Sequence, residues 1–191
     1  MAPIPGVVAS SITSSKLVTG DYESIATVSV GSGGASSITF SSIPSTYTHL
    51  QLRYIARNGY TLANTYTNSD LIVNSDSTAS HYTFHRLHGD GATVTADSAA
   101  NAGSIYVMST NGNASANVFV ACIVDILDYA NTNKYKTFRM LNGYDQNGSG
   151  IVGIRSGAWL STSAITSFTI TNPASANWNQ YSHFALYGIK S

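Results

Sequence analysis

Short runs in which apolar and polar residues alternate are the feature that most limits what this chain can fold into. The run THLQLRYIAR (48–57) places four apolar residues on one face: Leu50, Leu52, Tyr54 and Ala56. This period of two is typical of a β-strand with one face buried. About ten short runs with strand character follow one another from Asp21 onward, with turn residues between them. The run 118–127 is apolar on both faces, which predicts a central strand covered on both sides. Short strands at such spacing predict a single β-sandwich of jelly-roll type.

The composition also favours strands over helices. Ser, Thr and Asn number 28, 20 and 15, which is one residue in three, whereas charged residues make up only 9% of the chain. Ser, Thr and Asn compete with helical hydrogen bonding, and they suit strands, turns and exposed sheet faces. We therefore predict an all-β protein whose solubility comes from uncharged polar groups.

The charge balance limits the partners that such a chain attracts. Nine Lys and Arg residues offset nine Asp and Glu residues. Without a basic field, the chain has no electrostatic attraction for nucleic acid or an anionic membrane, so we expect neither as a partner. A low-charge surface is instead typical of a subunit held in a larger assembly, since free monomers usually carry a net charge that opposes self-association.

The first 20 residues differ from the rest of the chain. They contain two prolines in MAPIPGVV and a weakly patterned stretch, ASSITSSKLVTG. Such a segment folds poorly alone and suits a docking arm, and a disordered terminus has the same composition. We expect an extended N-terminal docking arm at 1–20 and the β-sandwich at 21–191. The segment lacks the basic and long apolar regions of a signal peptide, which favours synthesis and assembly in a cytoplasm.

Three of the five histidines lie within HYTFHRLHGDG (81–91). On a helix, His81, His85 and His88 would share one face, as zinc ligands often do. The segment is rich in Tyr, Thr and Phe and lies among strands, which favours a strand. On a strand, His81 and His85 are about 13 Å apart and His88 faces the other way, so no single ion can bind all three. We expect structural histidines and no metal site.

The other chemical groups give no convergent site either. Serine is so abundant that chance combinations with His and Asp are unavoidable, and the GxSxG turn of serine hydrolases does not occur. A glycosidase needs two carboxylates facing a cleft, but Asp125 and Asp128 would point to opposite faces of a strand. We expect Asp125 to be hydrogen-bonded or paired with an arginine, and Cys122 to be buried and inert. The sequence thus predicts no enzyme and no cofactor.

Aromatic residues in two polar segments suggest a different kind of site. Residues 58–69 and 172–181 combine Asn with Tyr or Trp, and NWNQY (177–181) has the mixture of amides and rings that sugar-binding proteins use. Aromatic side chains also pack sheets as a matter of course, and that interpretation is the favoured one. The candidate glycan contacts are Tyr60, Tyr66, Trp178 and Tyr181.

Several longer segments resemble small β-rich virion proteins of tailed bacteriophages. These segments are YESIATVSVGSGGASSITFSSIPSTYTHLQLR (22–53), FHRLHGDG (84–91), DILDYANTNKYKTFRMLNGYD (125–145), SAITSFTI (163–170) and HFALYGIK (183–190). The resemblance covers nearly everything after residue 21, and its motifs are hydrophobic patterns and turns. The position of His88 more often carries Tyr in that family, which favours a packing or surface role for this residue.

The resemblance implies a non-enzymatic structural protein of the virion. We expect a capsid decoration (cement) protein on the capsid exterior, with the major capsid protein and copies of itself, in a homotrimer, as partners. The arm would dock on the shell through its apolar residues, which are Ile4, Val7, Val8, Ile12 and Leu17. The alternative is a minor tail or tail-fibre protein that contacts host-surface glycans.

Overall fold

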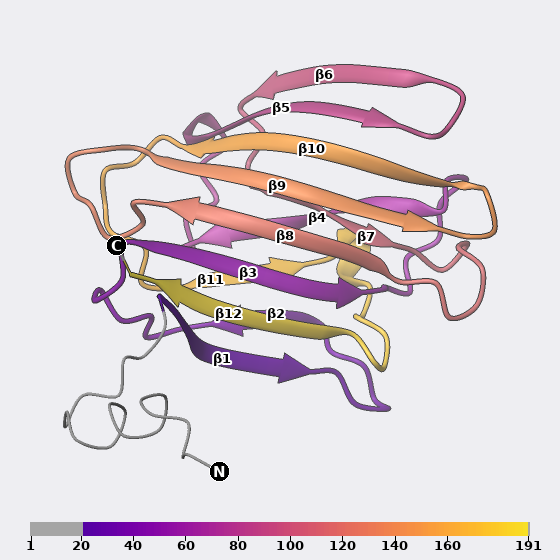
Figure 1. The fold of residues 1–191 in the computed structure, drawn as a ribbon, viewed down its shortest axis with the longest axis horizontal. Helices are drawn as coiled ribbons and strands as arrows, with labels where there is room; N and C mark the ends of the chain where they lie inside the picture. Colours follow the sequence, from indigo (N-terminus) through magenta and orange to yellow (C-terminus); the bar gives the residue numbers. More distant parts are fainter. Residues whose placement is uncertain (1–20, 191) are drawn as a thin grey trace, which may run out of the picture.

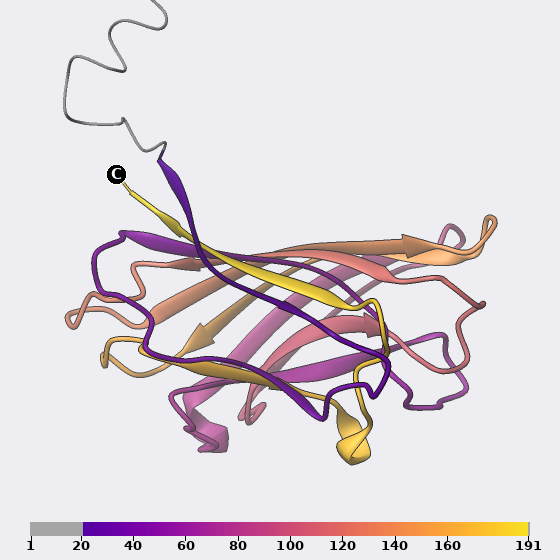
Figure 2. The same ribbon diagram turned by 90° about the horizontal axis from the view of Figure 1, so that it is seen from below.

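The computed structural model describes residues 21–190, and these residues form two antiparallel sheets stacked face to face (Figure 1, Figure 2). The prediction of an all-β sandwich is confirmed. The helical segments of this part of the chain are two 3₁₀ turns, η1 (Ala79–His81) and η2 (Pro173–Ser175). No helix within the described residues is long and apolar enough to cross a membrane. The proposed arm residues Ile4, Val7, Val8, Ile12 and Leu17 lie outside the described residues.

The two sheets differ in width. The larger sheet has the order β1 (Tyr22–Ser29), β12 (His183–Ile189), β3 (His49–Ala56), β8 (Val120–Leu127), β9 (Lys136–Asp145), β10 (Gly150–Trp159), β5 (Tyr82–Gly89) and β6 (Val94–Ala100). The smaller sheet has the order β2 (Ser37–Phe40), β11 (Phe168–Thr171), β4 (Tyr66–Val73) and β7 (Ile105–Thr110). The described residues therefore hold twelve strands, rather than about ten. The sequence VTADSAA of β6 gave no signal, because its side chains are small and almost entirely exposed.

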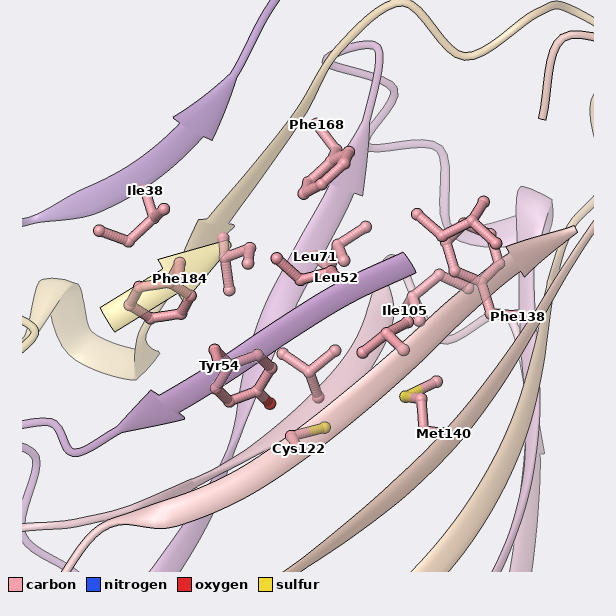
Figure 3. Packing of buried hydrophobic residues seen from close by; sticks show 14 of the residues in the cluster. Ile38, Leu52, Tyr54, Leu71, Ile105, Cys122, Phe138, Met140, Phe168 and Phe184 are labelled. Atoms are coloured by element: carbon pink, nitrogen blue, oxygen red, sulfur yellow. The ribbon is translucent and has the colours of Figure 1, made fainter. Parts of the chain in front are cut away.

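The core fills the space between the two sheets (Figure 3). Leu52 and Phe138 of the larger sheet and Leu71 and Phe168 of the smaller sheet are fully or almost fully buried there. Each such side chain contributes about 1.5–3 kcal/mol when it leaves water. The alternation predicted for residues 48–57 is confirmed, since Leu50, Leu52, Tyr54 and Ala56 are all buried. This core therefore fixes which face of each strand points inward.

A buried polar cluster joins the smaller sheet to two loops at one end of the sandwich. Asn58 donates from Nδ2 to Ser109 Oγ at 2.7 Å and to Asn172 Oδ1 at 2.9 Å. Ser69 donates to the same Asn172 oxygen at 2.7 Å. Because buried polar groups are costly without partners, this network holds the β3–β4 and β11–β12 connections against β4 and β7 in one arrangement.

The connections divide between the two ends of the sandwich. The N-terminal side of β1 and the end of β12 lie together at the left of Figure 1, and Tyr22 pairs with Ile189 there. The loops that contain the aromatic segments 58–65 and 172–182 lie at the opposite end. Asp21, the first described residue, therefore lies at the end remote from those loops, where its carbonyl accepts from the Lys190 backbone N–H at 2.9 Å.

One expectation about burial is wrong. The run 118–127 is apolar on both faces, which predicts a strand covered on both sides. In β8 only the inward residues, such as Cys122 and Val124, are buried, whereas Ala121 is exposed and Ile123 is only partly covered. The smaller sheet covers one side of β8, and no other described residues cover the second side.

Candidate functional site

The histidines of 81–91 do not converge. His81 ends η1 instead of beginning the strand, and its Nδ1 lies 2.7 Å from Asp76 Oδ2. His85 and His88 lie on opposite faces of β5, as alternation predicts, with His85 exposed and His88 beside the ring of Tyr66. Among residues 21–190, no three His, Cys, Asp or Glu side chains are placed to hold a metal ion.

Asp76 is instead a structural acceptor between the β4–β5 connection and β10. Its carboxylate accepts hydrogen bonds from Trp159 Nε1 at 2.7 Å and from the Thr78 backbone N–H at 3.0 Å, in addition to the contact with His81. These hydrogen bonds to the charged form hold the pKa of Asp76 well below its usual range, against the effect of burial. The carboxylate thus anchors the β4–β5 connection to β10.

Asp125 has the role that the sequence predicts for it. It accepts from Gln51 Nε2 at 2.7 Å and from Arg139 at 2.9 Å. Gln51 in turn accepts from Arg53 Nε at 2.5 Å, so that one chain of contacts crosses three strands on the outer face of the larger sheet. Asp128 is at a turn and pairs with Lys134 at 2.7 Å. The two carboxylates serve separate ion pairs.

Burial shifts the pKa values of two other side chains. Burial raises the pKa of the Cys122 thiol to about 12, which confirms the expectation of a buried, inert cysteine. Arg155 is buried between the sheets, donates to Tyr106 O and to Asn68 Oδ1, and has its pKa lowered to about 10 by desolvation. Both side chains therefore belong to the interior of the sandwich.

The four candidate glycan residues do not form one site. Trp178 is fully buried, packs edge-on against Phe184 and donates from Nε1 to Ile170 O at 3.3 Å. Its ring therefore belongs to the core and offers no surface to a sugar. Tyr181 is 75% exposed, beside a hollow of ≈ 560 Å³ that Arg57, Phe119 and Asn179 also line.

Tyr60 and Tyr66 are only half-buried, and Tyr66 lines a separate hollow. This hollow of ≈ 320 Å³ lies between the start of β4 and the turns after β5 and β9, and it is lined mainly by polar residues. His88 is among them, and its Nδ1 is buried without a hydrogen-bond partner. Burial lowers the pKa of His88 and favours the neutral ring.

The outer face of the larger sheet, which points away from the smaller sheet, has an apolar surface that sequence reasoning missed. Cross-strand pairing aligns one apolar row of Ala96, Leu87, Ile154, Leu141 and Ile123. A second row contains Val94, Gly89, Val152, Gly143, Ala121 and Ile55. We call these two rows the outer apolar patch. The run 118–127 is the part of the sequence that indicates this patch, because it is apolar on both faces. That pattern predicts a strand covered on both sides.

The exposure of the patch is unusual for an antiparallel sheet, whose solvent face is normally polar. Leu141, Val152 and Ile154 are 52%, 62% and 53% exposed. Six large aliphatic side chains of this face are exposed in total: Ile55, Leu87, Val94, Leu141, Val152 and Ile154. A contiguous exposed surface of this kind marks an interaction site with protein or another apolar partner.

Comparison of the chain with protein-family models, with curated proteins and with solved structures gives no match.

Proposed function

We propose that this chain is a non-enzymatic structural protein of a phage virion, and that it decorates and stabilises the capsid. The observation that carries the proposal is the outer apolar patch. A free monomer gains nothing from six exposed aliphatic side chains on one sheet face, whereas a subunit of a particle buries them against a neighbour. The near-absence of charge fits the same role, because 9% charged residues and no net charge do not oppose association.

The strand pairing supports a jelly roll as the basis of the fold. β1 pairs with β12, β2 with β11, β3 with β8 and β4 with β7. Four nested antiparallel pairs, distributed alternately over two sheets, are what a long hairpin gives when it rolls up into a jelly roll. The remaining strands, β5, β6, β9 and β10, extend one sheet beyond this unit.

The two ends of the sandwich suit different contacts. The segment 1–20 joins the sandwich beside the end of β12, and the loops with Tyr60 and Tyr181 lie at the other end. A decoration protein attached at the terminal end would present these loops outward. The major capsid protein and copies of the same chain are the partners in this proposal, with Ile4, Val7, Val8, Ile12 and Leu17 as anchoring residues.

Cryo-electron microscopy of the intact virion tests the proposal. We expect density for this sandwich on the capsid exterior, in many copies that follow the capsid symmetry. Adding the full chain, or a variant without residues 1–20, to shells that lack the protein then tests the arm. We expect the full chain to sediment with the shells and the shortened chain to remain in solution. A few copies at the tail, or none in the particle, would contradict capsid decoration.

A second candidate is a tail or tail-fibre protein that contacts host-surface glycans. The observation that favours it is the hollow beside Tyr181, where an exposed ring adjoins Asn179 and Arg57. Binding of the isolated protein to host cells, and its loss in Tyr181→Ala, would support this candidate. The matched control is Tyr135→Ala, since Tyr135 is similarly exposed but lies in the β8–β9 connection at the other end.

A further inference from the structure

The shape of the outer apolar patch indicates what covers it. The row of Leu87, Ile154, Leu141 and Ile123 stands between two hollows of ≈ 930 and ≈ 530 Å³, and Leu141 and Ile123 line both. On one side of this ridge the neighbouring row is polar and contains Ser98, His85, Ser156, Arg139 and Asp125. On the other side lie Gly143 and Ala121. The face therefore consists of one apolar ridge with a groove on each side.

In the second row of the patch, each valine lies next to glycine. Val152 pairs with Gly89 on one neighbouring strand and with Gly143 on the other, and Gly89 in turn pairs with Val94. An exposed Val152 thus stands between two positions that have no side chain. A surface of this form is complementary to itself, because a small shift places each large side chain over a glycine of the opposing copy.

The charges of the face lie at the margin of the patch. Asp125 is already paired with Arg139 and Gln51, and Arg53 is tied to Gln51. Arg139 and Asp125 lie in the row beside the ridge and line the same hollow as Leu87 and Ile154, whereas the row of Val152 on the other side contains no charged residue. An apolar centre with a polar margin is the usual anatomy of a protein interface, and paired charges at the margin limit repulsion between identical surfaces.

The outer face that carries the patch is close to the size that a stable contact needs. It extends over the six strands from β3 to β6, which at about 4.8 Å per strand spacing span about 24 Å. Strands of eight residues are about 27 Å long, so the outer face of these six strands, patch and polar margin together, covers roughly 650 Å² before the relief of the side chains is counted. A standard interface takes about 800 Å² from each partner.

We propose that the outer apolar patch packs against the same patch of a second copy of this chain, ridge into groove, in a twofold contact of two sheets. The inference rests on the proposed function, since it names one partner of a subunit in an assembly. It differs from the homotrimer that the family resemblance implies, because a twofold contact joins copies in pairs. The strands that extend the larger sheet, β9, β10, β5 and β6, carry most of this contact.

The test measures the mass of the full-length protein by light scattering and sedimentation equilibrium over a range of concentrations. We expect twice the chain mass of 20.1 kDa for the wild type. The double variant Leu141→Glu, Ile154→Glu places two charges at the centre of the ridge without touching the core. We expect its dimer dissociation constant to rise on the order of 100-fold or more.

The matched control is Tyr135→Glu, Tyr181→Glu, which replaces two equally exposed side chains outside the patch and should leave the dimer intact. Circular dichroism and thermal denaturation check that both double variants fold. A wild-type monomer at about 100 μM, a trimer, or a dimer that survives the ridge substitutions would each overturn the inference. If the wild type is monomeric but still decorates shells, and the ridge variant does not, the proposed function stands and the patch binds another virion protein.

Discussion

The inner and outer faces of the eight-stranded sheet carry similar side chains at neighbouring positions of the same strands. Met140 and Leu141 are adjacent in β9, yet Met140 is 3% exposed and Leu141 is 52% exposed. The smaller sheet covers the inner face, so its apolar residues determine the fold. The outer face has the same kind of residues and no covering layer among the described residues. The apolar character of a sheet face thus indicates a tendency to be buried. It does not indicate whether the same chain supplies the covering layer.

Substitutions in the inner face should have the largest effect on folding. Phe138 is fully buried between the sheets, and we expect Phe138→Ala to lower the free energy of unfolding by about 3–5 kcal/mol, through lost burial and the cavity that remains. Urea denaturation of the purified protein measures this change. The control is Thr137→Ala, whose side chain points outward from the adjacent position. A loss below about 1 kcal/mol would mean that the inner face is not the tightly packed one.

Substitution of Asp76, which anchors the β4–β5 connection to β10, should have a smaller effect on stability than Phe138→Ala, and this effect should depend on pH. Asp76→Asn weakens the hydrogen bonds from Trp159 and His81 and should cost about 1–3 kcal/mol at neutral pH. Because the folded-state pKa of Asp76 lies below its unfolded value, the carboxylate stabilises the fold above pH about 4. That contribution is lost as the pH falls toward the folded-state pKa. Equal acid sensitivity of the variant and the wild type, in denaturation from pH 7 to 2, would contradict this role.

The partly buried side chain of His88 in β5 allows a further test of the inner face. Its Nδ1 is buried without a partner, and burial lowers its pKa below the unfolded value of about 6.5. Protonation therefore favours the unfolded state, and stability should decrease as the pH falls below about 6.5. We expect His88→Phe to gain about 1 kcal/mol or less and to remove this dependence. His85→Phe, on the exposed side of the same strand, is the control; a similar gain there would mean that burial of Nδ1 is not the cause.

The inward-facing residues of strands such as β3 were predictable, because the alternation within one short segment is enough to reveal them. Leu50, Leu52, Tyr54 and Ala56 alternate with more polar residues, and the structure buries all four. β6 was not predictable, since VTADSAA has no apolar face and is held as a strand by its pairing with β5. The fate of Trp178 was equally hidden, because the sequence NWNQY does not reveal that its indole fills the core against Phe184.

The outer apolar patch shows a different limit of the sequence. Ile123, Leu141 and Ile154 come from three strands, and only their register places them in one row. Within each strand they look like ordinary apolar residues, and in 118–127 they suggest a strand covered on both sides. The described residues leave the outer side of this strand uncovered, so the expectation was wrong for a single chain. In the proposed twofold contact, a second copy would cover that side. If the proposed twofold contact forms, the sequence records burial in the assembly, of which a single chain shows only part.

The smallest effect on folding should follow substitution in the outer patch, where the comparison of the two faces is sharpest. Because Leu141 is half-exposed in the single chain, we expect Leu141→Thr to change the unfolding free energy by less than about 0.5 kcal/mol in dilute solution. At higher protein concentration the wild type should gain stability, since dimerisation removes folded monomer from the unfolding equilibrium, and the variant should gain less. Thermal denaturation from about 1 to about 100 μM measures both effects. A loss as large as that of Phe138→Ala in dilute solution would show that the outer face already contributes to the fold of the single chain.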